Sequence, residues 1–313
     1  MQRHGEGEIR IMSASRSLDR LGLFLTLAFC LSWSVQQVAA KLAMPEVPAL
    51  TQAAVRSVGA CLIVGMWMWL RQPDVFRRDG TLTSGLIAGF FFALEFLLLF
   101  LGLQRTTASH AILFIYTAPL FVSLGVIWVA PDERLRLSQW LGLALAFIGV
   151  ALALSVSFSV SRDMLIGDVL CLLAGIGWAI TTLIIKGTKL RFAPASKILL
   201  YQLAVSSIFL VLAALVKGES PSFSISALAY ASLAYQTIWV AAITFMGWMW
   251  LVAHYRAAEL SALTFLTPVL GVLAGWAIMG DPLPPQFTLA VALLIAGLLL
   301  VSWPRKAPRP EAA

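Results

Sequence analysis

The sequence predicts an all-α integral membrane protein with ten transmembrane helices, arranged as two inverted five-helix repeats. Three observations point to this class. Of the 313 residues, 60% are hydrophobic and 12% are charged, whereas soluble domains are typically about 45–50% apolar and about 25% charged. Apolar runs long enough to cross a bilayer follow one another without a long polar insertion. The second half of the chain also repeats the pattern of the first.

The predicted helices are read from these runs. A hydrocarbon core of about 30 Å needs about 20 apolar residues per helix. The runs cover residues 20–40, 49–70, 82–102, 108–130, 137–156, 164–186, 197–216, 227–250, 258–280 and 286–303. The residues before the first run show no pattern, and Met12 is an alternative start to Met1. A cleaved signal peptide is disfavoured because the first run has a counterpart later in the chain.

Lysine and arginine predict the orientation, because they concentrate in cytoplasmic connections. When successive connections are assigned to opposite sides of the membrane, most Lys and Arg residues fall on the side that holds both termini. The exceptions in the other connections are Lys41, Arg105, Arg162 and Lys217. We therefore expect a multi-pass protein of the inner (plasma) membrane with both termini in the cytoplasm. The net charge is +7, and the basic residues cluster between the apolar runs. This distribution is typical of a membrane protein and not of a nucleic-acid-binding protein.

The repeat is visible where SWSVQQVAAK (32–41) aligns with GWAITTLIIK (177–186). This alignment places Trp33 on Trp178 and Lys41 on Lys186, and the fourth and ninth runs match at Pro119 and Pro268. The predicted halves are residues 18–157 and 163–304. Because each half has an odd number of helices, the second half crosses the membrane in the opposite sense. Inverted repeats of this kind are typical of secondary transporters with a substrate site near mid-bilayer.

These residues carry a resemblance to a known family. The Trp…Lys element, Pro48 and Arg56 after it, the proline of the fourth run and GLALAFIGVAL (142–152) resemble the EamA repeat. Two such repeats make a member of the drug/metabolite transporter (DMT) superfamily. The resemblance covers about residues 18–303 and implies ten helices and export or exchange of small metabolites. The acidic turn of the family is Gly280-Asp281 in the second half, and in the first half Asp132 and Glu133 are both candidates.

Two charges lie inside predicted helices. Glu95 and Arg56 occur at similar depth on consecutive segments, and each alone costs about 2.5–3.5 kcal/mol at mid-helix. In one interpretation they form an interhelical salt bridge. In the other they face a cavity, where they bind charged ends of a substrate or where Glu95 takes a proton. The counterpart of Arg56 in the second half is Tyr201, so the pair is not duplicated.

Polar and aromatic residues near mid-membrane are further candidates. Two adjacent polar residues follow the tryptophan in each half, and we expect one of each pair to face the cavity. The candidate substrate-binding residues are Trp33, Gln37, Arg56, Glu95, Tyr116, Trp178, Thr182 and Tyr201. Interhelical hydrogen bonding and packing are the alternative roles of these residues.

No pattern indicates an enzyme. HExxH, GxSxG and nucleotide-binding loops are missing from the sequence, and Cys30, Cys61 and Cys171 form no CxxC pair. We expect no catalytic residue, no cofactor and no metal. The predicted function is a secondary carrier that exports or exchanges small metabolites, most plausibly amino acids or related amphipathic compounds, by alternating access. A channel-like or drug- or lipid-handling protein of the same superfamily is the alternative, and proton coupling and a homodimer stay open.

Overall fold

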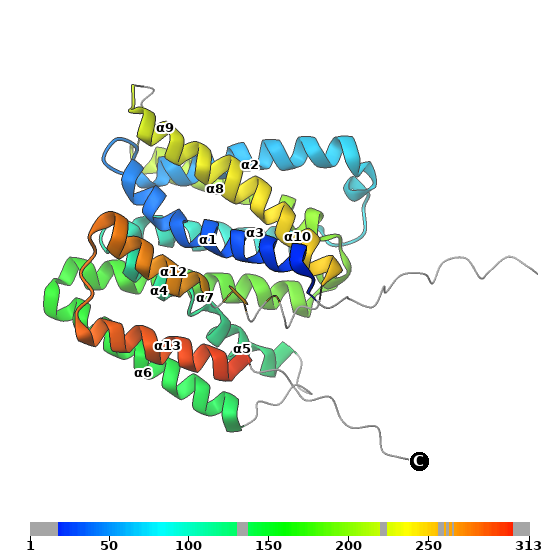
Figure 1. The fold of residues 1–313 in the computed structure, drawn as a ribbon. Helices are drawn as coiled ribbons and strands as arrows, with labels where there is room; N and C mark the ends of the chain where they lie inside the picture. The colour runs from blue at the N-terminus through cyan, green and yellow to red at the C-terminus, as the bar shows by residue number, and fades with distance from the viewer. Residues whose placement is uncertain are drawn as a thin grey trace, which may run out of the picture.

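The computed structural model describes residues 18–129, 137–219, 224–255, 260, 263–264 and 266–302 (Figure 1). All regular secondary structure in these ranges is helical. Met12, Asp132, Glu133 and most of the predicted start of the ninth helix lie outside the described residues.

The first half begins with α1 (Arg20–Ala43), α2 (Ala49–Arg71) and α3 (Leu82–Leu103), and a short 3-10 turn (Pro73–Phe76) precedes α3. Asp19 begins α1 because its carboxylate accepts the free backbone N–H of Gly22 at 2.8 Å. The predicted fourth helix is divided into α4 (Ala108–Ile115) and α5 (Ala118–Val129), and α6 (Leu137–Val160) completes the half.

The second half begins with α7 (Arg162–Gly187), a 3-10 turn (Lys189–Phe192) and α8 (Ala195–Val216). The predicted eighth helix is α9 (Ala227–Ala234), the π-helix η3 (Tyr235–Thr244) and α10 (Phe245–His254) in succession. It is followed by α12 (Leu266–Ala274), the π-helix η4 (Gly275–Met279) and α13 (Pro285–Ser302). Gly280 ends η4 with a φ of 71°, a left-handed conformation that glycine adopts at no steric cost.

A single apolar run was predicted over 108–130, and the structure divides it into α4 and α5. Pro119 has no N–H to donate to the carbonyl of Ile115, so the helix cannot continue through it. The chain tightens instead, and Thr117 donates its backbone N–H at 3.2 Å and its hydroxyl at 2.6 Å to the carbonyl of Phe114. Gly175 of α7 packs directly against this exposed backbone.

Close helix pairs from the two halves hold the fold together. The helices α6 and α13 lie side by side, and α7 packs against α3, α4 and α5 (Figure 1). The second helix, α2, packs chiefly against α8 and η3, while α1 packs against α12, α9 and η3. Small residues permit this proximity, as at Gly149, which faces the backbone of Ala290 and Leu294.

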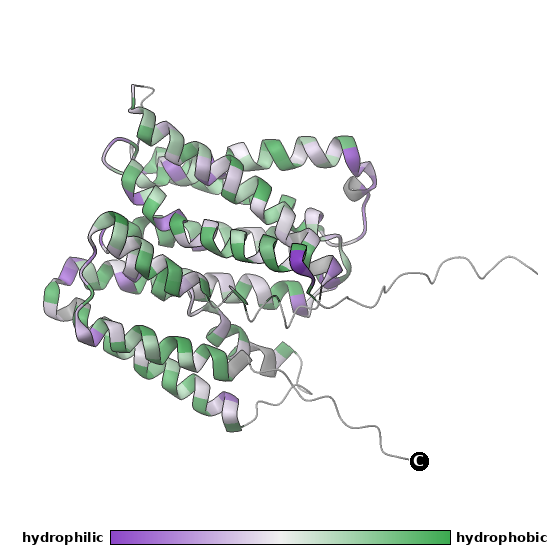
Figure 2. Cartoon of the chain, viewed as in Figure 1, coloured by the Kyte–Doolittle hydropathy of each residue, from purple (hydrophilic) through white to green (hydrophobic). Residues whose placement is uncertain are grey.

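Hydrophobic residues predominate along the helices of the bundle (Figure 2). Large hydrophobic side chains such as Phe24, Leu62, Trp128 and Val216 are exposed. Within the described residues, seven helices are long and apolar enough to cross a membrane, and three shorter apolar helices accompany them. Lipid, not water, is the solvent that accepts such a surface, so the chain is a multi-pass membrane protein.

Candidate functional site

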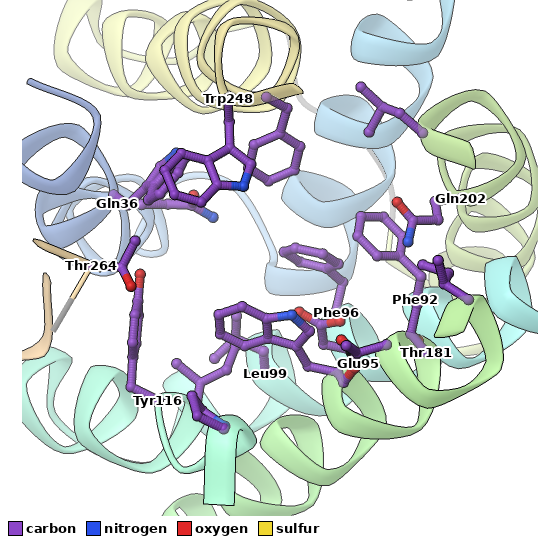
Figure 3. A pocket seen from close by; sticks show the side chains of 18 of the residues that line it. Gln36, Phe92, Glu95, Phe96, Leu99, Tyr116, Thr181, Gln202, Trp248 and Thr264 are labelled. Carbon is purple, nitrogen blue, oxygen red and sulfur yellow. Dashed lines mark hydrogen bonds between the residues drawn. The ribbon is translucent and has the colours of Figure 1, made fainter. Parts of the chain in front are cut away.

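A cavity of about 370 Å³ lies at the contact between the two halves (Figure 3). This volume falls in the range of small-molecule sites, about 300–1,000 Å³. Residues of α1, α3, α7, α8 and α10 and of the break between α4 and α5 form its wall. The lining residues are Trp33, Gln36, Gln37, Phe92, Glu95, Phe96, Leu99, Ile115, Tyr116, Pro119, Trp178, Thr181, Thr182, Ile185, Leu199, Gln202, Phe245, Trp248 and Thr264.

Six of the eight candidate residues line this cavity, and two do not. Arg56 and Tyr201 lie outside it. The lining candidates are Trp33, Gln37, Glu95, Tyr116, Trp178 and Thr182. The expectation that only one residue of each polar pair faces the cavity was too narrow, since Gln36 and Thr181 line it as well. Neighbouring residues on a helix point about 100° apart, and a cavity this wide covers both directions.

Several lining residues were missed by the sequence analysis. Phe92, Phe96 and Leu99 share one side of α3 with Glu95 at helical spacing, which was a usable signal. Phe245 and Trp248 follow the π-helix η3. Because the sequence has no periodicity that reveals a π-helix, the direction of these two side chains could not be predicted. Gln202 and Thr264 had no signal of their own.

Aromatic side chains of the two halves interlock around the cavity. Trp33 donates its indole N–H to the hydroxyl of Thr244 at 2.8 Å and meets Trp248 edge to face at 5.2 Å between ring centroids. On the opposite wall, Tyr116 and Trp178 meet edge to face at 5.6 Å. Such pairs hold large rings in one orientation, so the cavity has a fixed aromatic wall.

Glu95 is the charged residue of this wall. It is 5% exposed, and its Oε2 atom has no hydrogen-bond partner in the described part of the chain. Gly177 of α7 faces it, and a Cβ atom at Gly177 would lie in ordinary contact, 3.4 Å from the Cα and Cβ atoms of Glu95. Glu95 lies beside Phe96 and Leu99 at the edge of the pocket (Figure 3).

Arg56 lies behind the wall and is fully buried. Its guanidinium carbon is 4.0 Å from the centroid of the Phe96 ring and 5.7 Å from that of Phe245. None of its Nε, Nη1 and Nη2 atoms has a hydrogen-bond partner among the described residues. The interhelical salt bridge with Glu95 predicted as one alternative is therefore not formed. The physical reason is that α2 packs chiefly against α8 and η3 instead of α3, so Arg56 meets aromatic faces.

Tyr201 belongs to a polar group at the start of α3. Its hydroxyl lies 3.2 Å from that of Thr81, which donates to Asp79 at 2.5 Å. Lys197 of α8 donates to the other oxygen of Asp79 at 2.9 Å. The Thr81 hydrogen bond, and after it that of Lys197, lowers the pKa of Asp79 to about 2. This group ties the α2–α3 connection to α8 and is separate from the cavity.

The opposite end of the bundle is closed by buried polar contacts. Asp168 of α7 accepts the hydroxyl of Thr106 and lies 2.8 Å from Nδ1 of His110, whose ring stacks on Phe287 at 4.0 Å. Asp281 accepts the backbone N–H of Ser109 at 2.8 Å, which caps the first turn of α4.

The cavity, by contrast, reaches the end of the bundle where α7 finishes and α8 starts. Ile185 lies in the last turn of α7, and Leu199 lies near the beginning of α8. Both line the cavity. The site is thus continuous from mid-helix toward the side on which Arg71 and Lys186 lie.

The comparisons with known proteins agree with this architecture. The sequence profile of the EamA-like transporter family matches residues 20–155 and 165–303. The chain therefore belongs to the EamA-like transporter family, and the resemblance to the EamA repeat seen in the sequence is confirmed. It is a transporter-family protein, and several of its relatives are named as transporters or efflux pumps.

Two relatives and one solved structure are similar over nearly their whole length. The chain is 26% identical to the "Uncharacterized transporter YvbV" of Bacillus subtilis, over 95% of this chain and 97% of that one. It is 24% identical to the "Probable amino-acid metabolite efflux pump" of Salmonella typhimurium, over 90% and 95%. A crystal structure that is 18% identical has a TM-score of 0.63 and covers 90% of this chain and 96% of its own, which shows the fold alone.

Proposed function

We propose that the protein is a secondary carrier that exports or exchanges small amphipathic metabolites, amino acids or related compounds among them, across the inner membrane. The observation that carries the proposal is the cavity itself. It lies between the halves, and Trp33 with Trp178, and Gln37 with Thr182, line it from positions that correspond in the repeat. A site shared by two repeats is the arrangement that alternating access requires.

The pairing of helices supports two inverted halves, residues 18–157 and 163–304. In the repeat, α1 corresponds to α7, and α3 corresponds to the eighth helix, which contains η3. If each helix is replaced by its counterpart, the contact of α3 with α7 becomes that of η3 with α1, and both contacts occur. It likewise converts α2 with η3 into α8 with α3, and α1 with α12 into α7 with α4 and α5. The pairs α2–α8, α4–α12 and α6–α13 exchange into themselves. This pattern is the one expected from a pseudo-two-fold axis.

With both termini in the cytoplasm, as the Lys and Arg distribution predicts, the cavity faces the cytoplasm. The polar contacts of Asp168 and Asp281 then seal the outer end. The described arrangement is accordingly the inward-facing member of an alternating pair. Proton coupling through Glu95 and a homodimeric assembly are parts of the proposal that need their own tests.

Counterflow in proteoliposomes tests the carrier. Vesicles are loaded with a mixture of unlabelled amino acids, and uptake of labelled ones is followed. A carrier gives saturable uptake that the internal compound accelerates, and an unaltered compound is recovered. Linear uptake without acceleration would instead indicate a channel. Tags at the N-terminus and near residue 160 test the topology, since opposite faces of the bilayer are required.

A further inference from the structure

We infer that the cavity recognises a protonated amine. Its preferred cargo is then an amphipathic organic cation, with the ammonium group at Glu95 and the apolar part against the aromatic wall. The inference rests on the proposed carrier function and narrows its substrate class. It differs from the earlier alternative, in which Glu95 and Arg56 together bind the two charged ends of a zwitterionic substrate.

The charge of the lining points to a cation. Glu95 is the sole Asp, Glu, Lys or Arg among the residues that line the cavity in the described part of the chain. The guanidinium of Arg56 is separated from the cavity by the ring of Phe96. A ligand carboxylate would therefore meet the carboxyl group of Glu95 in a poorly hydrated site whose described lining holds no cation, which is unfavourable.

The unsatisfied hydrogen-bonding atoms of the lining are acceptors. Oε1 of Gln37 and Oε2 of Glu95 are buried and have no donor among the described residues. A buried acceptor without a donor is destabilising, so both oxygens favour a ligand that brings N–H groups. An ammonium supplies three donors and no acceptor.

The aromatic wall can also attract a cation, through the faces of its rings. The aromatic lining residues are Trp33, Phe92, Phe96, Tyr116, Trp178, Phe245 and Trp248. The faces of such rings attract organic cations, and cages of them bind quaternary ammonium groups. Phe96 already shows this property, because Arg56 lies 4.0 Å from its ring centroid. The same rings accept the apolar part of an amphipathic amine.

Three probes with one phenyl ring test the inference in the full-length protein in lipid nanodiscs. Phenethylamine carries only the ammonium, hydrocinnamate carries only the carboxylate, and phenylalanine carries both. We expect phenethylamine to raise the thermal unfolding temperature most and hydrocinnamate not at all. Glu95→Gln should weaken phenethylamine binding about tenfold to hundredfold, the usual loss for a charge-assisted hydrogen bond.

The controls separate a local effect from loss of folding. Asp163→Asn removes an exposed carboxylate outside the cavity and should leave binding unchanged. Gln37→Met, which removes the second free acceptor, should weaken phenethylamine binding about threefold to tenfold and keeps the test available if Glu95→Gln does not fold.

The outcomes distinguish this inference from the carrier proposal. Tighter binding of phenylalanine that is lost in Arg56→Gln would overturn the cation assignment and leave the carrier intact. Absence of binding by all three probes would also overturn it, while counterflow of other compounds would still support a carrier. Phenethylamine binding without counterflow would retain the site and contradict transport.

Discussion

The guanidinium of Arg56 lies over the face of Phe96, 4.0 Å from its centroid, and this ring separates a fully buried cation from the cavity. No described side chain accepts a hydrogen bond from Arg56, so the faces of Phe96 and Phe245 offset part of the cost of burying its charge.

A double-mutant cycle measures this contact. We expect Arg56→Met and Phe96→Leu to be coupled by about 0.5–2 kcal/mol in free energy of unfolding, measured in detergent micelles. Phe92→Leu is the matched control, since Phe92 also lines the cavity and packs on Phe96 at 4.9 Å between centroids, yet is not placed against the guanidinium. Equal coupling of Phe92 and Phe96 to Arg56 would rule out the cation–π explanation.

The break between α4 and α5 should be sensitive to the surface of α7. A Cβ atom at Gly175 would lie 2.9 Å from Oγ1 of Thr117 and 3.0 Å from the carbonyl oxygens of Phe114 and Ile115. We expect Gly175→Ala to destabilise the protein by about 1–3 kcal/mol, because backbone must shift to admit the methyl group.

Gly177→Ala is the control for that substitution, because its new methyl group would meet Glu95 at an ordinary 3.4 Å. Both changes replace glycine by alanine in α7, so the gain in helix propensity is the same in the two variants and cancels when their stabilities are compared. Thermal unfolding of the two variants gives the comparison, and equal stability of the two would show that the break is not tightly packed.

The sealed end depends on Asp168. Its buried carboxylate accepts from Thr106 and contacts His110, so Asp168→Asn should lower the free energy of unfolding by about 1–3 kcal/mol. Asp163→Asn, which removes an exposed ion pair with Arg105, should change it by about 0–1 kcal/mol. Unfolding in detergent measures both, and a loss of similar size in the two variants would contradict the proposed seal.

Asp79 should make stability depend on acid. Its folded pKa of about 2 is below the usual value of about 3.9, so its contribution is complete above the usual pKa and disappears as the pH falls through the folded one. The difference in unfolding temperature between the wild type and Asp79→Asn should thus be constant from about pH 7 to 5 and shrink between about pH 4 and 2. A difference that persists unchanged at pH 2 would exclude the Thr81 and Lys197 contacts as its cause.

The sequence predicted the helical membrane class, most helix positions and much of the cavity because these follow from hydropathy and from the repeat. Glu95 was recognisable as a lone carboxylate among apolar neighbours. The side of α3 that carries Phe92, Glu95 and Leu99 is buried as its spacing predicts. The two inverted halves and the cytoplasmic termini stay predictions.

The environment of Arg56 could not be predicted in the same way. Consecutive helices were assumed to be neighbours, which is a common arrangement, and α2 instead packs chiefly against α8 and η3. The break in the fourth helix follows from Pro119, but the contact of Gly175 with the carbonyls of Phe114 and Ile115 joins distant parts of the chain. Neither relationship leaves a periodic signal in the sequence.

The ten residues of η3 also govern how α10 presents its side chains. A π-helix closes each hydrogen bond one residue later than an α-helix, so it contains more residues per turn. Tightening of η3 to α-helical bonding would lengthen the segment and rotate Phe245 and Trp248 about the helix axis. Two of the seven aromatic residues found in the described lining therefore depend on the helical register of η3 for their positions.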